Sequence, residues 1–201
     1  MSRLIFGVIA VVVTGCFSPR THYYSLAPIE LTQPIRVSGL PLQISHVSIP
    51  AVLDRESLVE WTRTGELKMS DTNRWAAPLD EMIRDVLAAD LRHKLPGLVL
   101  LPGDPIETGE TRVIVVNVMH FAPDDSQRVV MLADWSLMSG QPAEPILTRS
   151  ETIKLPISSD QSSEVVPTMS EAVAILSDRI AYAIHAENPS NVSGSVLNMP
   201  S

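Results

Sequence analysis

The sequence predicts an α/β domain with a three-layer α/β/α arrangement, built on a mixed sheet with a large antiparallel part and two long helices. The main observation is the order of patterns: strand-like segments, a helical pattern, more strands, then a second helical pattern. This order is not a plain βαβ alternation. About 170 residues remain once the two ends are set aside, which is enough for one domain with a sizeable core.

The first group of strands lies before residue 71. LQISHVSI at 42–49 has apolar residues on both faces, as in a sheet covered on both sides, and Pro50 ends it. SLVEWT at 57–62 and ELKMS at 66–70 flank Gly65, which is typical of a hairpin.

The first helix is predicted within residues 72–95 from apolar residues spaced by three and four positions. Thr72 or Asn73 can cap it, Pro78 fits its first turn, and Pro96 follows its end. The apolar stripe consists of Trp75, Leu79, Met82, Ile83, Val86, Leu87 and Leu91.

The second group of strands begins with a short buried segment at 97–104. Two long strands, 111–121 and 128–138, are separated by a polar loop and predict an antiparallel hairpin. The second of them alternates, so that one face carries Val129, Met131, Ala133, Trp135 and Leu137. A further strand is predicted at 148–157.

The second helix is predicted over about residues 166–186, with its own apolar stripe. The stripe consists of Met169, Ala172, Val173, Leu176, Ile180, Ala183 and Ile184. The domain is therefore expected to span residues 41–187. The Ser- and Asn-rich tail at 188–201 is expected to be disordered.

The N-terminus predicts a signal peptide at residues 1–15. A short positive stretch ending at Arg3 precedes an apolar run of about ten residues, half of what a membrane-spanning helix needs. Small residues then lead to Cys16, the only cysteine. This arrangement resembles a bacterial lipobox, in which the thiol of Cys16 accepts a diacylglyceryl group and the chain is cut before it. An ordinary secretory signal and an uncleaved anchor are the alternatives.

The lipid on Cys16 would anchor the mature chain, because two or three acyl chains hold a protein on a bilayer far longer than one does. Phe17 stands where an Asp would retain a lipoprotein at the inner membrane, so we expect the periplasmic face of the outer membrane. Residues 16–40 are interpreted as the lipidated N-terminus and a Pro-containing tether that lifts the domain off the membrane.

The charge of the mature chain argues against several partners. Removing Arg3 with the signal leaves 14 of the 15 Lys and Arg residues against 23 Asp and Glu, a net charge of −9. Nucleic acids and anionic membrane surfaces require clustered basic residues. The aromatic content of 4% also argues against an aromatic-lined sugar or base platform.

No catalytic constellation is recognisable, and we expect no enzyme, metal or cofactor. The five histidines, at 22, 46, 93, 120 and 185, show no metal-ligand spacing. Asp124 and Asp125 fit a solvated turn better than an acid/base pair, and His120 fits a half-buried strand position. Trp75 and Trp135 are expected in the core.

Several motifs together resemble the ABC-type transport auxiliary lipoprotein family. They are YYSL at 23–26, IPAVLDRESLV at 49–59 and DTNRWAAPL at 71–79, in this order behind the lipobox. Within the motifs, Asp54 and Arg55 could cap a turn, and Trp75 could seal the helix against the sheet.

The resemblance implies a three-layer α/β/α fold and a non-catalytic role. The chain would dock a lipid-transport system that connects the two membranes, and its partners would be an MCE-domain (PqiB-like) protein and an inner-membrane permease. The resemblance leaves open whether the chain forms a homo-oligomer. The alternative is a lipoprotein that itself carries lipid or another small hydrophobic ligand. A deep apolar cavity between the second helix and the sheet would favour that carrier, whereas a filled core with an exposed patch would favour docking.

Overall fold

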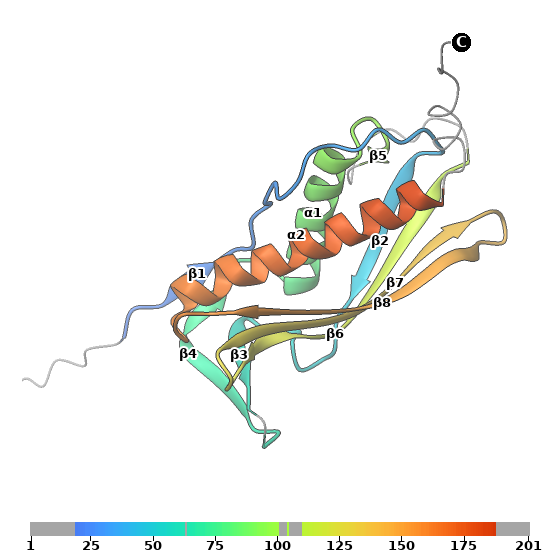
Figure 1. Ribbon diagram of the computed structural model, residues 1–201. Coiled ribbons are helices and arrows are strands. Elements are labelled where there is room, and N and C mark those ends of the chain that lie inside the picture. Colours follow the sequence, from blue (N-terminus) through green and yellow to red (C-terminus); the bar gives the residue numbers. More distant parts are fainter. Residues whose placement is uncertain (1–18, 63, 101–103, 105–109, 188–201) are drawn as a thin grey trace, which may run out of the picture.

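A 13-residue strand, β6 (Arg112–Asp124), is the centre of the sheet. The computed structural model describes residues 19–62, 64–100, 104 and 110–187 (Figure 1). The other strands are β1 (His22–Tyr24), β2 (Leu42–Ser48), β3 (Ser57–Trp61), β4 (Leu67–Trp75), β5 (Val99–Leu100), β7 (Arg128–Ser139) and β8 (Glu144–Pro156). The helices are α1 (Leu79–Lys94) and α2 (Ser162–Ala186).

The sheet is mixed, as predicted. On one side of β6, strand β2 pairs in parallel with its first half, and β3 meets its end, where Trp61 pairs with Asp124. On the other side β7 runs antiparallel along β6, and β8 runs antiparallel along β7. The strand order is β1-β4-β3-β6-β2-β5, with β7 and β8 beyond β6. Both predicted hairpins, β3–β4 and β6–β7, are confirmed.

The two helices lie together on one face of the sheet (Figure 1). Helix α1 packs against β2, and α2 packs against β7 and β8. The inward face of β7 is buried as predicted, from Val129 to Leu137. On the opposite face Val115 and Met119 of β6 are exposed.

The described part of the chain therefore has two layers, which corrects the expected three. The α/β class, the mixed sheet and the two long helices are confirmed. The layer count differs because the strands alternate. In β2, Ile44 and Val47 are buried, whereas His46 and Ser48 are exposed, so only one face needs a helical cover.

The first helix begins later than predicted. Thr72, Asn73 and Trp75 belong to the end of β4 and do not cap the helix, which starts at Leu79 directly after Pro78. The residue before a proline is disfavoured in the α region, so Ala77 interrupts the helical pattern. Trp75 is nevertheless buried, with 5% of its surface exposed.

Helix α2 starts at Ser162, four residues before the predicted start, because Val165 also faces the core. Its predicted stripe is buried, except that Ala183 is only partly so. Neither helix in the described part of the chain is both long and apolar enough to cross a membrane.

The chain between β1 and β2 runs along the two helices (Figure 1). The Ala27 amide donates to Ser170 of α2, over 3.1 Å. The Ile35 amide donates to the carbonyl oxygen of Lys94 in α1, over 2.7 Å. This stretch differs from the expected free tether, because its main chain is bonded to the domain.

Candidate docking site

Three segments that are far apart in the sequence meet where β4 leads into α1. Tyr23 of β1 pairs with Arg74 of β4 in a parallel register. The amide of Ala76 donates to the carbonyl oxygen of Tyr24 over 2.8 Å, and the amide of Trp75 donates to that of Glu56 over 2.7 Å. All three motifs of the sequence analysis therefore contribute to one surface.

The middle motif forms a tight turn. The amide of Leu53 donates to the carbonyl oxygen of Pro50 over 2.8 Å, and the amide of Arg55 donates to that of Leu53 over 2.9 Å. Leu53 is buried at 2% exposure, and its burial fixes the turn on the core. Asp54 and Arg55 are consequently held outward, where they are exposed.

The two arginines of this surface contact neighbouring exposed side chains. Arg74 and Glu56 form an ion pair of 2.6 Å, and the Arg55 guanidinium lies 2.9 Å from the sulfur of Met69. Side chains this exposed contribute at most about 1 kcal/mol to stability. Their role in the fold is small, so they are available to a partner.

Trp75 lines two concave features. On the outer side, a hollow of about 370 Å³ is lined by Tyr23, residues 54–56 and residues 75–78. On the inner side, an apolar cavity of about 220 Å³ lies between the sheet and the first turns of α2. The expectation that Trp75 lies in the core is confirmed by its burial.

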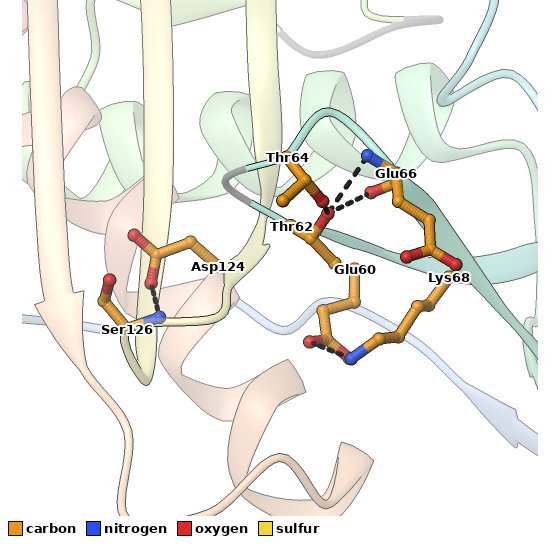
Figure 2. Close-up of polar contacts among 7 residues, drawn as sticks. All are labelled: Glu60, Thr62, Thr64, Glu66, Lys68, Asp124 and Ser126. Atoms are coloured by element: carbon orange, nitrogen blue, oxygen red, sulfur yellow. Dashed lines mark hydrogen bonds and ion pairs between the residues drawn. The ribbon is translucent and has the colours of Figure 1, made fainter.

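The apolar cavity has a hydrophobic floor and a polar rim. Floor residues come from strands and both helices: Leu58, Trp75, Leu79, Phe121, Val165 and Met169. Glu60, Lys68, Ser70, Asp160 and Ser162 also line it. Glu60 and Lys68 form an ion pair of 3.3 Å across β3 and β4 (Figure 2).

The volume of the cavity limits what it can hold. At about 220 Å³ it is smaller than the roughly 300–1,000 Å³ sites that enclose drug-sized ligands. It exceeds a cavity of about 150 Å³ that binds benzene. One aromatic or branched aliphatic group fits, whereas a whole two-chain lipid does not.

The β3–β4 hairpin is closed by its own hydroxyl groups (Figure 2). The Thr62 hydroxyl lies 2.9 Å from that of Thr64 and accepts a hydrogen bond from the Glu66 amide over 3.0 Å. Gly65 has φ +82°, a left-handed conformation that favours glycine. These contacts hold the hairpin that carries Glu60 and Lys68.

Asp124 is a structural residue of the β6–β7 turn. Its Oδ1 accepts hydrogen bonds from the amides of Ser126 (2.9 Å, Figure 2) and Arg128 (3.1 Å). Its Oδ2 lies 3.0 Å from the Arg128 guanidinium. All of these contacts are within the turn. Asp125 is exposed, as the solvated-turn interpretation expects, whereas only 17% of the Asp124 side chain is exposed.

His120 lies on the sheet face opposite the helices and is partly buried, as predicted. Its ring contacts Trp61 with 4.6 Å between ring centroids. Burial lowers the pKa of His120, with a smaller opposing effect of the Asp124 carboxylate. The other histidines lie elsewhere, and the described residues contain no group of three side chains that could hold a metal ion.

A buried polar network between the helices was missed from the sequence. Lys94 of α1 is 2% exposed and lies 3.2 Å from the carboxylate of Asp178 in α2. Thr32 donates to the same carboxylate over 2.8 Å, and the ammonium of Lys94 lies 5.0 Å from the ring centre of Tyr182.

Asp90 extends this network by one turn of α1. Its Oδ1 accepts the Ile29 amide over 2.9 Å, and Ser177 donates to its Oδ2 over 3.5 Å. Burial raises the pKa of Asp90 to about 6, against the opposing effects of these hydrogen bonds. The network binds residues 29–32 to both helices.

The chain belongs to a family of envelope proteins. The family model described as "ABC-type transport auxiliary lipoprotein component" matches residues 24–181, which is most of the chain and includes the three motifs except Tyr23. The resemblance drawn from the motifs is confirmed. Cys16, the predicted lipidation site, lies outside the described residues.

Two curated relatives are intermembrane transport lipoproteins named PqiC, from Escherichia coli (strain K12) and from Shigella flexneri. Each is 27% identical over 141 residues, which cover 68% of this chain and 74% of the relative.

Two solved structures share the fold. One is the crystal structure of an uncharacterised protein, with a TM-score of 0.70, 24% identity and coverage of 83% of this chain and 99% of that one. The other is protein XCC0632 from Xanthomonas campestris, with a TM-score of 0.66, 15% identity and coverage of 85% and 99%. At these identities the likeness concerns the fold alone.

Proposed function

We propose that this chain is a lipoprotein anchored in the outer membrane through Cys16 and a non-catalytic docking subunit of an MCE-type system that moves lipids between membranes. One observation carries the proposal: the motifs of a transport auxiliary family gather on one exposed surface of the fold. The relatives named intermembrane transport lipoprotein support the transport context. The partners are an MCE-domain protein and the inner-membrane permease that works with it.

The position of the surface supports docking close to the membrane. Residues 1–15 act as the signal peptide, and the mature chain begins at Cys16. This is six residues before His22, where β1 begins. Six extended residues span at most about 20 Å. Tyr23 and the hollow that it lines therefore stay near the lipid headgroups, where a bridge from the opposite membrane would end.

Transport of a bound hydrophobic ligand is the second candidate, because an apolar cavity does lie between α2 and the sheet. Its volume of about 220 Å³ argues against a carrier of whole phospholipids. Part of one acyl chain could enter it. We therefore favour docking, and lipid extraction decides between the two functions.

Fractionation and co-purification test the proposal. The full-length lipoprotein and its Cys16→Ser variant are expressed with an affinity tag and separated into inner membrane, outer membrane and soluble fractions. We expect the wild type in the outer membrane, and we expect an MCE-domain protein to co-purify with it. We expect Cys16→Ser to be unprocessed or released, because a hydroxyl cannot accept the thioether-linked lipid. Equal outer-membrane fractions of both would contradict lipid anchoring, and stoichiometric phospholipid without the MCE protein would favour the carrier.

A further inference from the structure

The apolar cavity opens beside a strand that has an unpaired edge. Strand β4 pairs with β3 along one side, but on the other side β1 covers only Asn73 to Trp75. Within the described chain, no strand lies beside residues 67–72 on that side. Strand β4 therefore presents main-chain groups to solvent next to the cavity that its residues line.

The hydrogen-bond pattern of the hairpin identifies which groups are free. The amide of Thr62 donates to the carbonyl oxygen of Glu66 over 2.9 Å, so the main-chain groups of this pair point toward each other, between the two strands of the hairpin. Hydrogen-bonded and non-hydrogen-bonded pairs alternate along an antiparallel ladder. Leu67, opposite Trp61, and Met69, opposite Val59, are therefore in non-hydrogen-bonded pairs, and their main-chain groups point away from β3. Their amides and carbonyls point to the open edge, where an extended peptide could pair with them.

The cavity beside this edge has the size of one side chain. About 220 Å³ with an apolar floor suits an aromatic or large aliphatic group. Met69 lines the same cavity and is 52% exposed, which is unusual for a residue of its kind.

The charge at the rim also selects the occupant. Lys68 and Glu60 neutralise each other at 3.3 Å. Asp160 lines the cavity and is exposed, and it forms no ion pair with the described residues. One negative charge is therefore left at the opening, which favours a basic residue next to the apolar one.

We infer that the open edge of β4 and the apolar cavity together bind an extended segment of a protein partner. The segment pairs with Leu67 and Met69, places one aromatic or large aliphatic side chain in the cavity and sets a basic residue against Asp160. The inference rests on the proposed docking function and assigns it a surface. The MCE-domain protein is the partner to test.

The test measures binding of the full-length lipoprotein, in detergent, to the periplasmic region of the MCE-domain protein by interferometry. Ser70→Trp fills the cavity from its lining, and Ser150→Trp adds the same side chain on exposed β8. Asp160→Lys reverses the charge at the rim, and Glu144→Lys is the matched change at the start of β8. Thermal melting checks that each variant is folded.

We expect Ser70→Trp to weaken binding at least tenfold and Asp160→Lys to weaken it at least threefold, with both β8 controls like the wild type. If the wild type binds and Asp160→Lys and a folded Ser70→Trp bind equally well, the inference is overturned while docking stands. If the wild type does not bind, both the proposed docking function and this inference fail. If native mass spectrometry finds an acyl-chain lipid that Ser70→Trp displaces while partner binding is unchanged, the cavity is a lipid site and the inference is wrong.

Discussion

The carboxylate of Asp90 accepts a hydrogen bond from the main-chain amide of Ile29 over 2.9 Å, which joins the segment that follows β1 to the C-terminal half of α1. Asp90 is 7% exposed, and burial raises its pKa to about 6. A carboxylate in this position binds the N-terminal segment but is costly to ionise.

Asp90→Asn should stabilise the protein at neutral pH. The folded pKa of about 6 exceeds the unfolded value of 3.8, so the folded state holds the proton more tightly. The stability that this provides is complete below about pH 4 and is lost as pH rises through 6. Asparagine keeps an acceptor for the Ile29 amide without the charge. We expect a gain of up to about 3 kcal/mol at pH 7 and little near pH 4.

Urea unfolding of wild type and Asp90→Asn at pH 4, 5, 6 and 7 checks this expectation. The difference between the two free energies of unfolding separates the effect of Asp90 from effects common to both proteins. The charges that act on Asp90 include those of Asp178 and His93. A difference that does not change with pH would contradict the raised pKa.

Lys94→Ala should destabilise the fold strongly. It leaves the Asp178 carboxylate, of which 17% is exposed, without its ion-pair partner between the helices. Removing one member of a buried pair costs about 3–5 kcal/mol. The control is Arg92→Ala, since Arg92 is half exposed and pairs with Asp104 at 3.5 Å. Its loss should cost less than about 1 kcal/mol in the same urea titration.

Leu87→Asp should prevent stable folding. Leu87 is fully buried on the inner stripe of α1, and an aspartate there has no evident partner. We expect a loss of several kcal/mol and low expression. Asp85→Leu, an exposed position on the same helix, should melt close to the wild type. A Leu87→Asp variant with an unchanged melting temperature would show that the buried face of α1 has been assigned incorrectly.

Single alanine substitutions of the five histidines should leave transport activity intact, because docking asks none of them to transfer a proton or hold a metal. Membrane-integrity assays in a strain lacking the gene compare the variants with the wild type. Loss of activity in a folded histidine variant would argue for chemistry at that residue.

Asp124→Ala should also keep activity but lower stability by about 1–3 kcal/mol, because the amides of Ser126 and Arg128 lose their acceptor.

The sequence was sufficient where a single element shows its own period. Alternation in β7 placed Val129 to Leu137 in the core, and the Gly65 turn placed the β3–β4 hairpin. It was insufficient where two patterns overlap. Trp75 fits the helical spacing of α1, yet the proline at 78 leaves it at the end of β4.

Features that join distant segments could not be read from the sequence. Asp90 and Lys94 are one turn apart and close to Leu87 and Leu91, which is a visible irregularity in an apolar stripe. Their partners Ile29 and Asp178 lie 61 and 84 residues away along the chain, so only the fold brings them together. The three motifs were similarly recognisable one by one in the sequence, but not as parts of a single surface.

Affinity between the full-length lipoprotein and the periplasmic region of its MCE-domain partner tests the central claim most directly. We expect saturable binding of modest affinity for one copy, because a shared membrane raises the effective concentration in the cell. The matched sample is analysed for bound phospholipid, which should be below one molecule per chain. Absence of binding at high micromolar concentration, together with stoichiometric lipid in the purified protein, would contradict docking and support a carrier.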